Sequence, residues 1–348
     1  MILMMCTGAK GGMLSVVEGY RRCGLIDDCH VRLIFTHYTG SLTSRLLISL
    51  RSLGSLLRAL VFNHVTGVHL HAATRGSFWR KSIFGLVSRW FGARVVYHLH
   101  GSEMKPFIEG LTPWARAIAV MLLERADAVI VLSDSWHQYV SKLAPRARLR
   151  LIPNFIEVGA LPPFNPGEQV RFLFLGELGK RKGIYDLLPA FAKGLETNPA
   201  MRLIVGGDGE LLECRELAEK LGLSSKIEFL GWISGDSKQH ALANADAFVL
   251  PSYNEGLAMS ILEAMAHGLP VISTRVGGIP QAVLNGRTGL LFDAGDKPAL
   301  TAALLTIASS PELRREMGAA GHSLALAEFS DLAVVPKIKC LYKELGME

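Results

Sequence analysis

The sequence has few cysteines, and their spacing indicates no metal or disulfide motif. The chain contains no CxxC pair and an odd number of cysteines, so neither a disulfide framework nor a structural zinc site is expected. The five residues are Cys6, Cys23, Cys29, Cys214 and Cys340. This usage fits a reducing compartment.

Long apolar runs and targeting segments are also missing. No charge-free apolar run reaches the roughly 18 to 20 residues that a membrane-spanning helix needs. The N-terminal MILMMCTGAKGG is too short, and too uncharged at its start, for a secretory signal, so a cytosolic topology is expected. Hydrophobic residues still make up 49% of the chain and the mean hydropathy is +0.28, which indicates large buried parallel sheets or contact with a membrane surface.

Charge is unevenly distributed along the chain. Residues 1–160 contain 19 lysines and arginines against 9 acidic residues, whereas residues 161–348 contain 18 against 22. The split indicates that the first half faces something anionic, such as lipid head groups, nucleic acid or a phosphorylated acceptor, although chance drift in surface charge would look the same. Nucleic acid is the weakest of these because the basic half contains no recognisable nucleic-acid-binding module.

The periodicity predicts an α/β protein with two domains. Ten short runs rich in Val, Ile and Leu are continuously apolar, as expected of strands covered on both faces by helices, and longer helical patterns separate them. A chain of 348 residues fits two domains. We place them at residues 1–158 and 169–326, with a proline- and glycine-rich linker at 159–168. Pro336 should kink the last helical segment or mark a helix start.

Glycine-rich loops follow several predicted strands, where ligands of open parallel sheets bind. The first loop contains Gly8, Gly11 and Gly12 before a helix, so its backbone can approach a phosphate or sugar, or simply make a tight turn. Its spacing does not match the dinucleotide-binding fingerprint. Gly206, Gly207 and Gly209 crowd after another strand, and Gly231 and Trp232 end the next; together they could form a slot for a flat base, although Gly231 and Trp232 alone would fit a turn with a packed tryptophan.

Two strand-end loops contain titratable or basic side chains. In VVYHLHGSE, His98 and His100 share a face, so a metal pair is conceivable, but no suitably spaced third ligand is evident. His100 is better placed to point into a cleft, and no metal site is predicted. In FLGELGKRKG, the cluster Lys180, Arg181 and Lys182 could neutralise an anionic leaving group, or be a solvated surface run.

The segment SYNEGLAMSILEAMAHGLPVIST contains the paired carboxylates Glu255 and Glu263. If a helix begins near Gly256, the N–H groups of residues 256–259 are free to bind an anion, and Glu255 lies beside them. Glu263 is then about 80° around the helix, so both carboxylates can line one groove. One would accept from sugar hydroxyls and the other from a ribose diol.

Together these motifs resemble the retaining glycosyltransferases of family 4, which have the GT-B fold: two Rossmann-like doubly wound domains facing each other across a cleft. The most specific match is PSYNEGLAMSILEAMAHGLPVISTRVGGIPQAV, supported by GELGKRKG, LIVGGDGE, IPN at 152–154 and the N-terminal glycine loop. The resemblance covers nearly the whole chain. It also implies that a closing helix, residues 327–348, crosses back to the first domain.

The resemblance implies roles for individual residues. The catalytic set would be Lys182, Glu255, His100 and Arg181, with Lys182 at the diphosphate and His100 near the sugar. The remaining donor contacts would come from Gly11, Gly12, Gly176, Gly207, Gly209, Trp232, Ile233, Gly256, Leu257, Ala258 and Glu263. Glu177 stands where family members often have an arginine, and Gln281 where they often have a glutamate; Arg181 can supply the second positive charge.

The implied reaction is transfer of a hexose from a UDP- or GDP-linked sugar with retention, in which the leaving diphosphate takes the acceptor proton. No cofactor is expected beyond this co-substrate. Because the chain lacks a DxD motif, a metal-bridged diphosphate is not required.

The first domain should bind the acceptor. The resemblance and the charge pattern together predict a polyprenyl-diphosphate-linked glycan in exopolysaccharide, capsule or O-antigen synthesis, contacted by Arg80, Lys81, His71 and Glu103. Residues 44–62 and 75–94 combine arginines with Leu, Phe and Trp at helical spacing, which favours peripheral binding to an anionic membrane on the cytoplasmic side, although a core-facing helix would look similar.

Two other functions fit the same residues. One is a nucleotide-sugar epimerase on the same scaffold, and the other is a non-catalytic nucleotide-sugar-binding component of a polysaccharide assembly complex. The base and sugar of the donor, the linkage and the oligomeric state cannot be read from these motifs.

Overall fold

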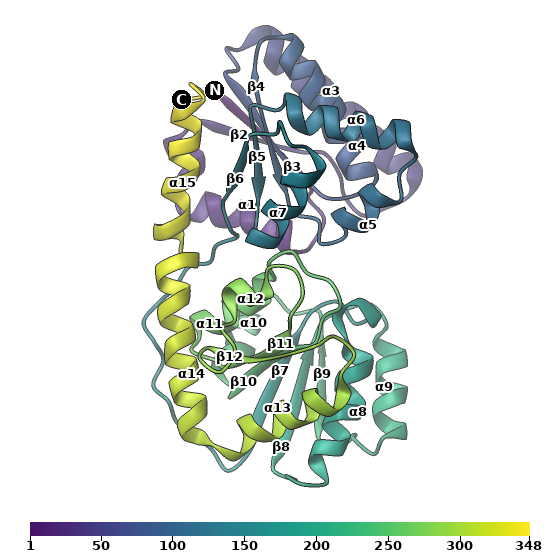
Figure 1. The fold of residues 1–348 in the computed structure, drawn as a ribbon. Helices are drawn as coiled ribbons and strands as arrows, with labels where there is room; N and C mark the ends of the chain where they lie inside the picture. The colour runs from purple at the N-terminus through teal and green to yellow at the C-terminus, as the bar shows by residue number, and fades with distance from the viewer. The chain divides into compact units, whose positions relative to one another are not determined.

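The computed structural model describes all 348 residues, which form two compact α/β units. Unit 1 comprises Met1–Phe155 together with Asp331–Glu348, and unit 2 comprises Ile156–Ser330. Each unit contains one six-stranded sheet in which every neighbouring pair of strands is parallel (Figure 1). The GT-B architecture of two doubly wound sheets is confirmed. Residues 159–168, the predicted linker, contain no helix or strand.

The sheet of unit 1 has the strand order β2-β1-β3-β4-β5-β6. Its strands are β1 (Ile2–Cys6), β2 (Val31–Phe35), β3 (Gly67–Ala72), β4 (Arg94–Leu99), β5 (Ala128–Val131) and β6 (Leu149–Leu151). Its helices are α1 (Gly12–Arg22), α2 (Leu25–Asp28), α3 (Leu42–Phe62), α4 (Gly76–Trp90), α5 (Met104–Glu109), α6 (Pro113–Arg125), α7 (Asp134–Leu143) and the C-terminal α15 (Asp331–Glu344).

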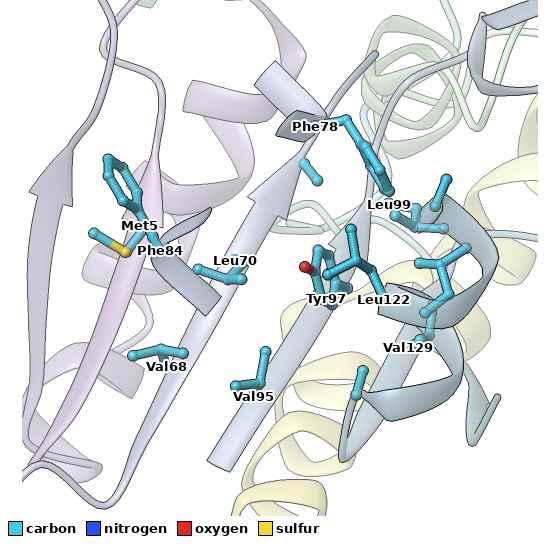
Figure 2. Close-up of a cluster of buried hydrophobic side chains, with 14 of the residues drawn as sticks. Met5, Val68, Leu70, Phe78, Phe84, Val95, Tyr97, Leu99, Leu122 and Val129 are labelled. Atoms are coloured by element: carbon cyan, nitrogen blue, oxygen red, sulfur yellow. The ribbon is translucent and has the colours of Figure 1, made fainter. Parts of the chain in front are cut away.

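Alternate residues of these strands build the core on one face of the unit 1 sheet. Met5, Leu70 and Tyr97 pack there against Phe78 and Phe84 of α4 and against residues of α3, α5 and α6 (Figure 2). Strand residues between them, such as Met4 and His69, point to the opposite face. That face therefore has its own packing partners, among them Tyr342 of α15.

The sheet of unit 2 has the order β12-β11-β10-β7-β8-β9. Its strands are β7 (Val170–Leu175), β8 (Met201–Gly206), β9 (Ile227–Gly231), β10 (Ala247–Leu250), β11 (Val271–Thr274) and β12 (Gly289–Phe292). The 3₁₀ turn η1 (Lys180–Lys182) precedes the helices α8 (Ile184–Leu195), α9 (Leu211–Lys220), α10 (Gly235–Ala243), α11 (Met259–Ala266), α12 (Ile279–Ala282), α13 (Lys297–Ser309) and α14 (Pro311–Leu324), and the π-helical turn η2 (Ala325–Phe329) ends the unit.

All ten expected strands are present, and two further strands, β6 and β12, lie at sheet edges. Both are short and partly exposed. Arg150 interrupts the apolar run of β6, whereas β12 has the continuous apolar run GLLF and was not recognised as a strand. Pro336 does not mark a helix start, because α15 begins five residues earlier and continues through it. Pro336 has no N–H to donate to the carbonyl of Leu332, one turn back.

Helix α15 packs within unit 1, far in sequence from its partners. The Tyr342 hydroxyl hydrogen-bonds His69 Nδ1 at 2.6 Å, and Lys339 Nζ donates to the Asp28 carboxylate at 2.6 Å. Tyr342 is fully buried. The C-terminal residues of the chain thus complete the covered face of the first sheet. No helix of the chain is both long enough and apolar enough to span a membrane.

Candidate active site

The candidate site of unit 2 lies at the carboxyl ends of neighbouring strands. β10, β7 and β8 are adjacent in a parallel sheet, so the loops that follow them emerge at one edge. These loops contain most of the predicted donor-binding residues of the second domain. All of these loops belong to unit 2.

An ion pair between Lys182 and Glu255 joins two of these loops. Lys182 Nζ donates to Glu255 Oε1, and the Ser252 hydroxyl donates to the same oxygen at 2.9 Å. The Glu255 side chain is 7% exposed and that of Lys182 14%. The stem of Lys182 passes over Gly176, where a Cβ would lie 3.6 Å from its Cδ. Lys182 and Glu255, 73 positions apart in sequence, are thus held together.

Two glycines let backbone segments come close together around the ion pair of Lys182 and Glu255. Gly183 has φ +75°, and a Cβ there would lie 1.9 Å from the carbonyl oxygen of Pro251, just before Ser252. Gly277 has φ +56°, and its Cβ would lie 1.7 Å from the carbonyl oxygen of Glu255. No other residue fits at these points without moving the backbone. The glycines therefore set the depth at which Glu255 lies.

Helix α11 begins later than the sequence indicated. It starts at Met259 rather than near Gly256, with Ala258 as its N-cap, so Glu255 lies upstream of the helix. The predicted 80° separation of Glu255 and Glu263 around one helix is therefore wrong. A segment of non-helical backbone, buried from Glu255 to Ala258, separates the ion pair from the helix. Gly256 O accepts from Gly278 N at 2.6 Å, which holds this segment against the loop after β11.

The N-terminus of α11 retains backbone donors. No side chain caps it, and its first turn contains no acidic residue. The N–H groups of Met259 and Ser260 make no hydrogen bond within the protein, and both residues are only half-buried. Such an end favours negative charge. Glu263, one turn further on, is paired with Lys238 of α10 at 2.6 Å.

Arg181 is paired differently from Lys182. Its guanidinium Nη2 lies 2.9 Å from Glu177 Oε2, and both side chains are substantially exposed. Glu177, which stands where family members often have an arginine, therefore offsets the charge that was expected to support Lys182. Exposed pairs of this kind contribute little to stability, so a more strongly bound anion can displace Glu177 from Arg181.

The remaining predicted residues of unit 2 lie at the ends of β8 and β9. Gly207 N donates to Gly231 O at 2.7 Å, and a Cβ at Gly207 would lie 1.8 Å from the carbonyl oxygen of Gly176. Gly209 would likewise place a Cβ 2.5 Å from the carbonyl oxygen of Leu178. Trp232 is 42% exposed, and next to it the half-buried Ile233 packs near Gly206.

The predicted residues of unit 1 lie at the carboxyl ends of β1, β3 and β4. Gly11 is the N-cap of α1 with φ +139°, and Gly12 is its first residue; no side chain caps this end. His71 Nδ1 and His100 Nε2 are 2.7 Å apart. Glu103 is exposed at the start of α5.

Arg80 and Lys81 are neighbours on α4, and neither forms an ion pair. Lys81 is fully buried, and its Nζ donates to the Ser77 hydroxyl at 3.3 Å. Burial is the main cause that lowers the pKa of Lys81 to about 7, and the charge of Arg80 contributes to the same shift. The Arg80 Nε is buried without a hydrogen-bond partner. Two basic groups without a carboxylate are unusual in a protein interior.

Sequence reasoning missed several residues that complete these contacts. Ser252 was identifiable as a hydroxyl near Glu255, but no pattern singled out Lys238, which lies on a helix of weak amphipathicity 25 positions from Glu263. His69 alternates with His71 in β3, but its pairing with His98 was missed because cross-strand register is not visible in one segment.

Comparison with known proteins identifies the family. Residues 17–159 match the family model described as Glycosyltransferase Family 4, and residues 162–323 match that described as Glycosyl transferases group 1. The lipopolysaccharide core biosynthesis glycosyltransferase LpsE of Rhizobium meliloti strain 1021 is 31% identical over 244 residues, 67% of this chain and 70% of LpsE. The chain belongs to glycosyltransferase family 4. It is a retaining glycosyltransferase that transfers a sugar from a nucleotide sugar.

Other proteins resemble the chain in sequence or in fold. The N-acetyl-alpha-D-glucosaminyl L-malate synthase of Bacillus anthracis is 27% identical over 263 residues, 72% of this chain and 68% of that protein. Sucrose-phosphate synthase from Thermosynechococcus elongatus has a TM-score of 0.81 at 23% identity, covering 99% of this chain and 98% of its own. Anabaena HepE, solved in complex with UDP-glucose, has a TM-score of 0.75 at 20% identity and 99% coverage of both chains.

The close approach of Gly183 to Pro251 in this family 4 enzyme is tested by comparing the substitution Gly183→Ala with the control Gly222→Ala. Gly222 also has a positive φ, +70°, but a Cβ there would meet nothing within 4 Å. We expect Gly222→Ala to cost about 1 kcal/mol from backbone strain. Gly183→Ala should cost at least about 2 kcal/mol more, because it also forces β10 and η1 apart. Urea denaturation with hydrogen exchange of α8 and α11 peptides measures both.

Equal destabilisation by the two substitutions would show that the approach of Gly183 to Pro251 does not hold the loops together. A selective loss of protection in α8 and α11 for Gly183→Ala would support it.

Proposed function

We propose that this enzyme transfers a hexose from a UDP- or GDP-linked sugar, with retention, to a glycan carried on polyprenyl diphosphate, as in exopolysaccharide, capsule or O-antigen synthesis. The observation that carries the donor half of this proposal is the buried pair of Lys182 and Glu255 beside the uncapped start of α11. The acceptor half rests on the basic surface of α3 and α4, two helices that contain no acidic residue.

The pairing of Lys182 leaves its capacity for phosphate intact. An ammonium group has three N–H donors, and only one of them is used by Glu255. With the N–H groups of Met259 and Ser260, the remaining donors supply charge and hydrogen bonds for a diphosphate. Preorganised donors of this kind stabilise charge on a leaving group by roughly 3 to 4 kcal/mol each. The departing diphosphate can then take the proton of the acceptor hydroxyl.

Glu255 and Glu263 each retain one carboxylate oxygen that can accept a hydrogen bond from a hydroxyl group of the donor. Both hydrogen bonds to Glu255 reach Oε1, and the bond from Lys238 reaches Oε1 of Glu263. The Oε2 atoms are thus available, Glu255 for the sugar and Glu263 for the ribose. Backbone at Gly256, Leu257 and Ala258 would line the space between them.

The ends of β8 and β9 would bind the base. Gly207 and Gly209 let main chain approach the ligand, and the half-exposed Trp232 with Ile233 offers an apolar face to a planar ring. The UDP-glucose in the HepE structure supports a uridine donor here, and a guanosine donor is the alternative. In unit 1 we assign backbone at Gly11 and Gly12 and the ring of His100 to the donor sugar.

A phosphorylated acceptor fits the cations of α4. Lys81 is buried without a carboxylate, and Arg80 has a buried, unpartnered Nε, so a bound phosphate would supply the missing negative charge. We assign His71, beside His100, and Glu103 to the same acceptor. The lipopolysaccharide role in the name of LpsE supports a lipid-linked glycan, whereas the malate synthase shows that acceptors differ among relatives.

The surface of α3 and α4 suits an anionic membrane. Residues 29–102 contain no Asp or Glu and nine lysines and arginines. On α3, Arg45, Arg51 and Arg58 are exposed beside apolar side chains. The exposed apolar residues of α3 and α4 are Leu42, Leu46, Leu47, Leu50, Leu57, Val61, Phe62, Ile83, Leu86 and Trp90. Phe91, the residue after α4, is exposed as well.

This combination of basic and exposed apolar side chains favours anionic lipid over a protein as the partner of the surface. A protein partner would need a complementary acidic, apolar face, whereas anionic lipid supplies negative head groups above an apolar layer. A depression of about 1080 Å³ at Arg32, Arg58 and Phe62 gives a head group a place to bind. We therefore place the enzyme as a peripheral protein on the inner face of the cell membrane.

The donor assignment predicts that Lys182→Ala lowers kcat about a hundredfold or more, because the leaving diphosphate loses its fixed cation. The measurement is product formation from labelled UDP- and GDP-sugars with a polyprenyl-diphosphate glycan. Lys193→Ala is the control, since Lys193 pairs with Glu196 on the exposed face of α8. Near-normal turnover by Lys182→Ala, in a protein whose hydrogen exchange is unchanged, would contradict the assignment.

The membrane assignment predicts flotation with vesicles of phosphatidylglycerol and phosphatidylcholine at low salt. Replacing Leu46 and Leu50 together by Glu should reduce the bound fraction at least tenfold, because it puts two anions into the lipid-facing surface. The control is Leu212→Glu, which changes an equally exposed leucine of unit 2. Wild-type protein that stays at the bottom of the gradient, or equal losses for both variants, would overturn this assignment.

A further inference from the structure

Four histidine rings gather on one face of the unit 1 sheet. His69 and His71 alternate along β3, His98 lies in β4 in register with His71, and His100 follows β4. Neighbouring ring centroids are 4.0 to 5.3 Å apart. His69, His71 and His98 are fully buried. Neither the donor site nor the assigned acceptor contacts use His69 or His98.

The rings form two hydrogen-bonded pairs that end in unpaired nitrogens. His69 Nδ1 lies 2.6 Å from the Tyr342 hydroxyl, and His69 Nε2 lies 3.2 Å from His98 Nδ1. His71 Nδ1 lies 2.7 Å from His100 Nε2. The Nε2 atoms of His71 and His98 are buried and have no partner. Burial lowers the pKa of all four rings, that of His69 to about 3, so they are neutral.

A neutral imidazole has one N–H and one lone pair, so the hydrogen bond at His98 Nδ1 decides whether His98 Nε2 is a donor or an acceptor. If Tyr342 donates to His69 Nδ1, the proton of His69 lies on Nε2 and is given to His98 Nδ1, so His98 Nε2 carries an N–H without an acceptor. If His69 donates to Tyr342 instead, His98 Nδ1 donates back to His69 and His98 Nε2 presents a bare lone pair. In this second state the Nε2 atoms of both rings have lone pairs, and a metal bound at His69 Nε2 takes the place of the hydrogen bond from His98 Nδ1.

Unpaired nitrogens on adjacent buried rings are costly, since each forfeits the hydrogen bonds it makes in water. A core that needed only volume would be served by apolar rings at these positions. One ring nitrogen from each of His69, His71 and His98 lies within 4.8 Å of the other two. Tetrahedral zinc with Zn–N bonds of 2.0 to 2.1 Å sets nitrogens about 3.4 Å apart. Small rotations of the rings would therefore bring the three nitrogens into range.

We propose that His69, His71 and His98 bind one transition-metal ion, for which Zn²⁺ is the probe, and that this ion links β3 to β4 beneath α15. Three neutral imidazoles suit zinc, copper or nickel rather than the oxygen-seeking Mg²⁺ or Ca²⁺. Tyr342 and His100 hydrogen-bond the second nitrogens of His69 and His71, so they act as positioning residues. The site is independent of the donor-binding loops of unit 2, but it shares His71 and His100 with the sugar and acceptor contacts proposed for unit 1.

Nearby charge sets the conditions for binding. Lys81 acts electrostatically on His71 and His100, and its positive form opposes a cation. Because burial lowers the pKa of Lys81 to about 7, much of it is neutral at pH 8. Metal titrations are therefore made at pH 8.

The test uses the full chain, without an affinity tag and stripped of metal by a chelator. Zn²⁺ is titrated against a chromophoric chelator, and Co²⁺ reports geometry by its visible absorption. We expect one equivalent per chain and the intense bands of tetrahedral Co²⁺. His98→Phe, which keeps a ring in place, should weaken Zn²⁺ binding at least about 100-fold, and Tyr342→Phe by about 10- to 100-fold. His64→Phe, at an exposed histidine of unit 1, should change nothing.

Wild-type protein without tetrahedral Co²⁺ bands would overturn the proposal, whether or not any variant folds. Stoichiometric binding that survives both His71→Phe and His98→Phe, in variants with native circular dichroism, would also overturn it. In either case the rings form a packed stack whose orphan nitrogens have another partner.

Discussion

The ion pair between Lys182 and Glu255 is the contact on which the candidate active site depends. It joins the loops after β7 and β10, adjacent strands whose carboxyl ends share one edge of the unit 2 sheet. Because both side chains are largely buried, removing one partner leaves an uncompensated charge rather than a solvated one. The glycines at 183 and 277 make the pair possible by bringing backbone within contact of Pro251 and Glu255. The charges of the ion pair, its burial and the backbone conformation at the two glycines therefore depend on one another.

The sequence predicts the central strands and the glycine-containing loops after them well, because both depend on local signals. Continuous Val, Ile and Leu runs mark buried parallel strands, and glycine after such a run marks a close approach of backbone. The edge strand β6 lacks that signal because Arg150 interrupts it, whereas β12 has the apolar run GLLF and was missed. The start of α11 was misplaced because Gly256–Ala258 is buried as non-helical backbone against the loop after β11, a tertiary contact that local propensity does not contain.

Pairings between distant segments were the least predictable part of the site. The partners Lys238 and Glu263 lie on different helices, 25 positions apart. The histidine cluster shows the same limit. His98 and His100 were visible as one strand-end pattern, but His69 and His71 lie beside them only through the register of β3 on β4. Register is a property of the folded sheet, and two segments read separately do not reveal it.

The central claim is that the loops of unit 2 surround the diphosphate and sugar of a nucleotide sugar. Hydrogen exchange of the intact enzyme with and without UDP-glucose, GDP-mannose and inorganic phosphate tests this most directly. The account predicts that a nucleotide sugar, but not phosphate at the same concentration, slows exchange at residues 176–183, 206–209 and 255–260. Protection confined to other segments, with these three unchanged at saturating nucleotide sugar, would contradict it.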